Sequence, residues 1–310
     1  MYFPYLRGRQ YELIAIRELV ENDLIGPKII PIIEPVKPSS TFKKTIDVFI
    51  KNEHKLAVVH NPQVASYLKA LASLEEGLLK SELENIYEQE NIIFSHILND
   101  KSEDELIGFE TIRNEDMLVI VNEVDFIEEY KDIFHDELPR FTLVPDESAF
   151  RRNIREDKIL LEDRFKKQKR NADYAEVTDE FYSEDHLYYK SDGYIGFSDY
   201  SIVGSDYFDS GFAPFAVVIH IVYLDEEEKL RIKHFVSDSN DDINDPAGKF
   251  YEALQKLMAW QKEVEVDTFA MREFKKFYEN ETYPGLGTVK KLSIMHHLEI
   301  VNQYFEEYTR

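Results

Sequence analysis

Eight short apolar runs in the first two-thirds of the chain each end in charged, amide or imidazole side chains. Stretches with helical spacing separate most of these runs, which lie at 2–7, 29–34, 56–61, 92–96, 118–123, 141–146, 159–163 and 194–199. Strands that alternate with helices form parallel sheets, and eight such units fit a closed (β/α)8 barrel. The pattern therefore predicts an α/β protein with a TIM-barrel-like fold, in which functional side chains follow the carboxyl ends of the strands.

The pattern changes after residue 215. Two apolar runs at 216–224 and 230–236 flank an acidic turn, which predicts a β-hairpin, and helices are expected after it. We expect residues 1–210 to form the barrel, and residues 211–310 to form a C-terminal β-hairpin and helical appendage that pack on it as the same structural unit. The edge of the hairpin suits docking of another protein, and covering the flank of the barrel is the alternative.

The chain is strongly acidic, because 61 Asp and Glu residues against 37 Lys and Arg give a net charge of −24 over 310 residues. This charge repels phosphate backbones and anionic lipids, so neither non-specific nucleic-acid binding by the whole surface nor membrane association is expected. A protein partner, or a second copy of the chain, is the partner that we predict. Simple solubility is the alternative reason for the charge.

Cysteine is absent, which excludes disulfides, thiolate catalysis and cysteine-bound metal sites. The N-terminal segment lacks a basic stretch followed by an apolar one, and no apolar run approaches the ~20 residues of a membrane span. We therefore expect a cytoplasmic protein.

The polar ends of the apolar runs indicate a candidate site at one rim of the barrel. Imidazoles and carboxylates that converge on a concave site suit a divalent metal or a general acid–base pair. The candidate catalytic residues, which are also the candidate ligands of such a metal, are His60, His96, Asp146 and Glu162. No HxH, HExxH or DxD spacing identifies a metal site, and strand-end polar residues also cap helices and form ion pairs.

The candidate ligand-binding residues are taken from the same strand ends and from the segment after the seventh strand. They are Arg7, Glu34, Asn61, Asn122, Asp199, Arg164, Lys166 and Lys167. Neighbouring side chains on a strand point to opposite faces, so only one of each adjacent pair can face the mouth of the barrel. The sequence leaves open which one does.

A basic segment at 164–170 follows the seventh run, where (β/α)8 enzymes often hold a phosphate. Its cations could bind a phosphorylated ligand or a nucleic-acid backbone. The interpretation that we favour is that they neutralise surrounding acids such as Glu156, Asp157, Glu162 and Asp173. A polar, Tyr-rich stretch then separates this segment from the eighth run.

The segments YFPYLRG at 2–8, ELIA at 12–15 and IPIIE at 30–34 resemble the opening of the beta-protein family of bacterial proteins, which is named after a phage protein. Looser agreement comes from SDY at 198–200, the aromatic-rich hairpin and His296-His297. The resemblance implies a barrel-like fold and occurrence near mobile elements and defence genes. It implies no settled activity, although Glu12 and Glu34 match positions prominent in the opening motif.

Two function hypotheses follow. The first is a ligand- or partner-binding barrel protein that belongs to a bacterial anti-phage defence or mobile-element system, which rests on the resemblance and on the acidic surface. The alternative is a metal-dependent hydrolase of a phosphodiester or a phosphorylated small molecule. In that case the basic segment would bind the anion.

Overall fold

The computed structural model describes residues 1–109, 111–208, 214–264 and 266–308. The chain divides into two compact units that interleave along the sequence. Unit 1 consists of Met1–Leu13, Pro27–Asp163 and Asp185–Tyr200, and unit 2 consists of Ile14–Gly26, Arg164–Glu184 and Ser201–Arg310. The boundary expected between residues 210 and 211 lies outside the described residues.

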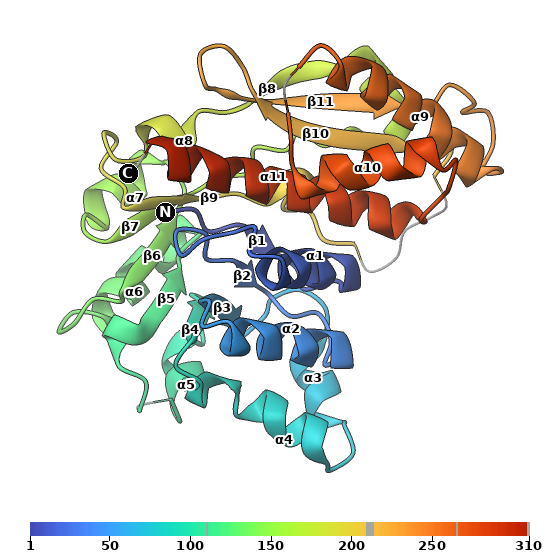
Figure 1. The fold of residues 1–310 in the computed structure, drawn as a ribbon. Coiled ribbons are helices and arrows are strands. Elements are labelled where there is room, and N and C mark those ends of the chain that lie inside the picture. Colours follow the sequence, from blue (N-terminus) through green and yellow to red (C-terminus); the bar gives the residue numbers. More distant parts are fainter. Residues whose placement is uncertain (110, 209–213, 265, 309–310) are drawn as a thin grey trace. The chain divides into compact units, whose positions relative to one another are not determined.

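Unit 1 contains an eight-stranded sheet in the order β1-β2-β3-β4-β5-β6-β7-β9, and its neighbouring strands pair in parallel (Figure 1). The strands are β1 (Tyr5–Leu6), β2 (Ile32–Ile33), β3 (Leu56–Val59), β4 (Ile92–Ile97), β5 (Met117–Ile120), β6 (Phe141–Val144), β7 (Lys158–Leu161) and β9 (Gly196–Ser198). All lie within the predicted runs or extend them by no more than a residue at an end. The structure thus confirms an α/β, TIM-barrel-like fold.

The first and last strands of this sheet come together. Tyr2 forms a parallel bridge with Phe197, and the backbone N–H of Phe3 donates to the carbonyl of Phe197 over 2.8 Å. The N–H of Tyr5 donates in the same way to the carbonyl of Asp199, also over 2.8 Å. These bonds join β9 to the segment that leads into β1, so the sheet curls into a barrel.

The interior of the barrel is a packed apolar core. Alternate residues of each strand point inward, and the interior residues are Phe3, Tyr5, Ile30, Ile32, Ala57, Val59, Ile93, Ile97, Leu118, Ile120, Phe141, Leu143, Ile159 and Leu161. The residues between them are also apolar, because they face the helices outside the barrel. This burial on both faces explains why the strands read as continuous apolar runs.

Helices connect the strands of unit 1. They are α2 (Ser40–Lys51), α3 (Tyr67–Ala72), α4 (Leu78–Glu84), α5 (Ser102–Leu106), α6 (Ile127–Ile133), α7 (Ser148–Asn153) and α8 (Asp185–Tyr188). In α2, the Ser39 hydroxyl caps the first turn by accepting from the N–H of Phe42 over 3.2 Å. Phe42, Ile46 and Phe49 then form the buried stripe of that helix. Helix α1 (Gln10–Glu21) begins in unit 1 and continues in unit 2.

Unit 2 contains a three-stranded antiparallel sheet in the order β10-β11-β8. Strands β10 (Val218–Leu224) and β11 (Leu230–Val236) pair across the 225–229 turn, and β8 (Asp179–Ser183) adds to β11. Helices α9 (Pro246–Gln261) and α11 (Leu286–Tyr308) pack against β10, and α10 (Phe269–Glu279) packs against both helices. Among the described helices, none has both the length and the apolar character needed to cross a membrane.

Candidate functional site

The candidate residues divide into two groups according to the face of the sheet on which they lie. Side chains on one strand alternate between the faces, so residues two positions beyond the last interior residue face the mouth of the barrel. The last interior residues of six strands are Tyr5, Ile32, Val59, Ile120, Leu161 and Ser198. Two positions further along the chain, and therefore at the mouth, lie Arg7, Glu34, Asn61, Asn122, Asp163 and Tyr200, in the same order.

The other candidates fall on the outer face of the sheet, where His60, His96 and Asp199 are buried, Glu162 is half-buried and Asp146 is exposed. His60, His96, Asp146, Glu162 and Asp199 each lie an odd number of positions from an interior residue of the same strand. All four candidate catalytic residues therefore point away from the interior of the barrel. Of the candidate ligand-binding residues at strand ends, only Asp199 shares that outer face.

Arg7 and Glu34 form an ion pair at the mouth, directly after β1 and β2. The Glu34 carboxylate is fully buried, and its Oε2 accepts from Arg7 Nη1 and, over 2.7 Å, from the Tyr5 hydroxyl. Its Oε1 accepts from the backbone N–H groups of Gln63 at 2.8 Å and Val64 at 3.1 Å. Four hydrogen-bonding groups from two segments thus converge on one carboxylate, which holds the guanidinium in a single position.

Two tyrosine rings flank the Arg7 guanidinium. Its Cζ lies 5.1 Å from the centre of the Tyr5 ring and 5.3 Å from that of Tyr200, and the two rings are 5.0 Å apart. Such contacts between a cation and a ring face are attractive, and more so where water is excluded. Burial raises the pKa of Tyr200 to about 12, so its hydroxyl stays protonated at neutral pH.

Charges of opposite sign act on the Tyr200 hydroxyl. The positive charge of Arg7 lowers its pKa, while the carboxylates of Glu34, Asp163 and Glu162 raise it. Leu161 of β7 pairs with Ser198 of β9, which brings the chain at Asp163 alongside Tyr200. The Tyr200 hydroxyl makes no hydrogen bond with any described residue.

The Asn61 side chain bonds to the backbone of the neighbouring strand, β4. Its Nδ2 donates to the carbonyl of Ile97 at 2.8 Å, and its Oδ1 accepts from the N–H of Ile97 at 2.9 Å. Nδ2 also donates to Glu105 Oε2 at 2.7 Å. The side chain continues the pairing of β3 with β4 beyond the last backbone bonds. Asn122, by contrast, is exposed.

His60 and His96 contact each other between the sheet and the helices. Nε2 of His60 and Nδ1 of His96 share a hydrogen bond of 2.6 Å, and Nε2 of His96 lies 2.7 Å from the Ser102 hydroxyl of α5. The chain of bonds is satisfied if that hydroxyl donates to His96 and His96 donates to His60. The His60 ring stacks on Phe94 with a centroid distance of 4.5 Å. Burial lowers the pKa of His60 to about 3 and that of His96 to about 4.

Asp146 and Glu162 form a separate group at the ends of β6 and β7. The backbone N–H of Asp146 donates to Glu162 Oε1 over 2.9 Å, and the Asp146 carboxylate accepts from Arg151 and from the Tyr194 hydroxyl. Asp199 accepts from the Tyr2 hydroxyl at 2.7 Å, next to the barrel closure.

Within the described part of the chain, no three His, Asp or Glu side chains are placed to hold one metal ion.

The basic segment belongs to unit 2, where acids surround it. Lys166 pairs with Glu180 at 3.2 Å, Lys167 lies 4.0 Å from Asp206, and Arg170 binds Asp173. These contacts support the interpretation that the cations neutralise acids, although of the acids named in advance only Asp173 takes part. Arg164 also lies in this unit.

Tyr5 and Tyr200 are site residues that the sequence interpretation did not select. Both rings lie against Arg7, and the Tyr5 hydroxyl bonds to Glu34. Counting by two from Ser198 would have placed Tyr200 at the mouth, but that count needs to know which face of the strand is inward. For Tyr5, which sits in an apolar run, no such signal exists.

Comparison with known proteins adds nothing to this geometry. No family model, curated protein or solved structure matches the chain. The candidate site therefore rests on the Arg7–Glu34 pair, the two tyrosines and the acids beside Tyr200.

Proposed function

We propose that this chain is a ligand-binding barrel protein, and that its ligand is a small molecule carrying both a carboxylate and an ammonium group. The observation that carries the proposal is the setting of Tyr200. Its hydroxyl makes no hydrogen bond with a described residue, its ring lies against the guanidinium of Arg7, and the acids at the end of β7 are close enough to raise its pKa. Functional groups of (β/α)8 proteins lie at this end of the barrel.

The buried ion pair supports a binding role. Taking an arginine and a glutamate out of water is unfavourable unless the remaining polar atoms are satisfied. Here Tyr5, Gln63 and Val64 satisfy the carboxylate, so the guanidinium is fixed before any ligand arrives. Preorganised groups bind more tightly because less conformational freedom is lost on binding.

The charges at the mouth favour a dipolar ligand over a simple anion. Arg7 is already paired with Glu34, and Asp163 adds negative charge near Tyr200. An anion alone would be repelled by these carboxylates. A ligand with a carboxylate toward Arg7 and an ammonium toward Asp163 complements both sides.

The other hypotheses stay predictions. Membership of a defence or mobile-element system, and binding of a protein partner, follow from the resemblance and the acidic surface. The metal-dependent hydrolase has no observation that favours it, because its four candidate residues form two groups on the outer face of the sheet.

The test is a thermal-shift screen of the full chain with the twenty amino acids, and with acetate and methylammonium as the two halves of the ligand. A ligand present at about ten times its Kd adds about 1.4 kcal/mol to the unfolding free energy. We expect at least one amino acid to raise the Tm by roughly 2–5 °C, and acetate or methylammonium alone to leave it unchanged.

Tyr200→Phe removes the hydroxyl and keeps the ring against Tyr5 and Arg7. We expect this variant to fold as the parent does and to lose the amino-acid shift. Tyr11→Phe, which removes the hydroxyl of an exposed tyrosine, is the matched control, and we expect it to retain the amino-acid shift in Tm. The proposal fails if no amino acid shifts the Tm, or if Tyr200→Phe responds as the parent does.

A further inference from the structure

A second concave site lies in unit 1, at the end of the barrel opposite to the mouth. The cavity has a volume of about 480 Å³, within the range of small-molecule sites. Its walls come from the residues that precede β3, β4, β5 and β6 and from the first residues of β4. Residues that define it are Lys55, Tyr87, Phe94, Thr111, Arg113 and Arg140.

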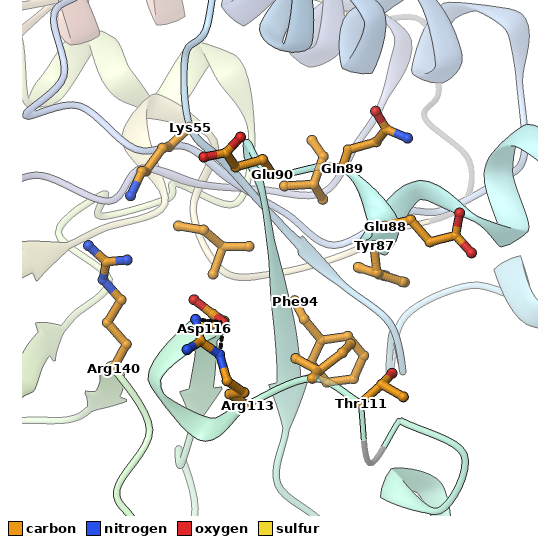
Figure 2. A pocket seen from close by; sticks show the side chains of 13 residues that line it. Lys55, Tyr87, Glu88, Gln89, Glu90, Phe94, Thr111, Arg113, Asp116 and Arg140 are labelled. Atoms are coloured by element: carbon orange, nitrogen blue, oxygen red, sulfur yellow. Dashed lines mark hydrogen bonds and ion pairs between the residues drawn. The ribbon is translucent and has the colours of Figure 1, made fainter.

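Two cations in this cavity lack a counter-charge. Among the described residues, neither the Lys55 ammonium nor the Arg140 guanidinium has a carboxylate within ion-pair distance. Arg113, in contrast, binds Asp116 at 2.8 Å and also pairs with Glu115. In Figure 2 the charged ends of Lys55 and Arg140 point toward one another on one side of the cavity. They are placed to bind one anionic group from two sides.

The other side of the cavity is aromatic. Phe94 and Tyr87 lie edge to face with ring centres 5.0 Å apart, and Figure 2 shows both rings and Thr111 away from the two cations. The Tyr87 hydroxyl forms no hydrogen bond with a described residue. A flat ring could pack on this surface and bond to the hydroxyl, because stacked and edge-on aromatic contacts are both favourable.

We propose that this cavity binds a phosphate monoester attached to a flat ring, of the size of a nucleoside monophosphate. The phosphate lies between Lys55 and Arg140, and the ring contacts the half-buried Tyr87, which packs on the fully buried Phe94. A phosphate monoester suits two cations better than a carboxylate does, because it carries a charge of about −1.5 to −2 at neutral pH. The acids at the rim, Glu88 and Glu90, are exposed and disfavour small anions that lack a ring to hold them.

The site is distinct from the mouth of the barrel, and it is a binding site, not a catalytic one. Catalytic groups of (β/α)8 enzymes lie at the carboxyl ends of the strands, whereas this cavity is at the amino ends. Phe94 also stacks on His60, so a ligand ring against Tyr87 would contact the edge of the aromatic layer that contains the histidine pair.

The experiment is isothermal titration of the full chain with adenosine monophosphate, adenosine and inorganic phosphate. We expect the monophosphate to bind, and adenosine and phosphate each to bind at least tenfold more weakly. Lys55→Gln and Arg140→Gln should each weaken monophosphate binding about tenfold or more, as expected for a charge-assisted hydrogen bond. Both side chains are at the surface of the cavity, so the variants are expected to fold.

Matched controls remove the same charges outside the cavity. Lys51→Gln changes an exposed lysine at the end of α2, and Arg152→Gln changes an exposed arginine of α7. Both should bind the monophosphate as the parent does, and so should Tyr200→Phe. The inference is overturned if adenosine binds as tightly as the monophosphate, if no monophosphate binding is detected at millimolar concentration, or if Lys55→Gln and Arg140→Gln leave the Kd unchanged.

Discussion

Single polar residues in this protein are held by partners far away in the sequence. Glu34 bonds to groups at positions 5, 7, 63 and 64, and Tyr2 bonds to Asp199. The histidines follow the same rule, because His60 and His96 bond only once β3 and β4 are paired. Both are buried and uncharged at neutral pH, as their lowered pKa values show. Because both histidines are buried without a charge, we expect acid to destabilise the folded state.

We predict that the unfolding free energy falls as the pH is lowered from about 6.5 toward 4. In the unfolded chain His60 takes up a proton near its ordinary pKa of 6.5, whereas in the folded chain it does so only near 3. Acid therefore favours the unfolded state, by up to about 1.4 kcal/mol per pH unit for each such histidine. Urea unfolding at several pH values measures the slope.

His60→Gln should make this slope shallower by up to about 1.4 kcal/mol per pH unit between pH 6 and pH 5. Burial also lowers the pKa of His96, His220, His234 and His296, so part of the slope persists. His135→Gln, at an exposed position, is the control and should leave the slope as it is. If the unfolding free energy of His60→Gln varied with pH as steeply as that of the parent, His60 would have the same pKa in the folded and unfolded states, which would contradict the prediction.

At the scale of elements, the strands agree with the sequence pattern more closely than the helices do. Each strand of the barrel is a short apolar run, which its two buried faces require. The stretch at 64–88 is rich in Leu and Glu, which favours one long helical region. The structure instead divides it into α3, α4 and a 3-10 helix at Ile86–Glu88, with Gly77 directly before α4. The closure of the barrel depends on another glycine, Gly196 in β9. A Cβ atom there would lie 2.9 Å from the Met1 carbonyl oxygen and 2.9 Å from the Phe3 ring.

We predict that Gly196→Ala destabilises the protein by about 1–3 kcal/mol, as overpacking of a buried position does. The added methyl group pushes the N-terminal segment away from β9, and the bonds that close the barrel weaken. Gly77→Ala is the matched control, because the distance from its added Cβ to the nearest heavy atom would be 3.9 Å, an ordinary van der Waals contact. Urea unfolding compares the two, and equal stability would mean that the closure tolerates a side chain at residue 196.

At the scale of the whole molecule, the two units are not consecutive along the chain. Unit 2 includes the second half of α1, where Ile16, Leu19 and Val20 are buried. Glu18 of that helix accepts from Lys291 of α11 at 2.6 Å, and the N–H of Gly26 donates to Asn302 at 2.8 Å. Strand β8, from the middle of the chain, likewise completes the sheet of β10 and β11. A division of the gene at one position cannot separate the units.

We therefore predict that a chain truncated after residue 208 does not fold as a monomeric barrel. Ile16, Leu19, Val20 and β8 would lose the segments that cover them, and exposed apolar surface of this kind leads to aggregation. Size-exclusion chromatography and a thermal melt followed by circular dichroism compare the truncated with the full-length chain. A monomeric fragment with a cooperative melt would contradict the prediction.

The sequence by itself determined the barrel, because burial on both faces demands continuous apolar runs, and eight such runs separated by helices indicate eight parallel strands. It also placed candidate site residues at the strand ends, and Arg7 and Glu34 lie there together. Only the tertiary structure decided which residue of each adjacent pair faces the mouth. A shift of one position turns every side chain of a strand to the other face, and an apolar run without alternation does not show where the count begins. For the same reason His60, His96, Asp146 and Glu162, which the sequence favours, lie on the outer face, while Tyr200 lies at the mouth.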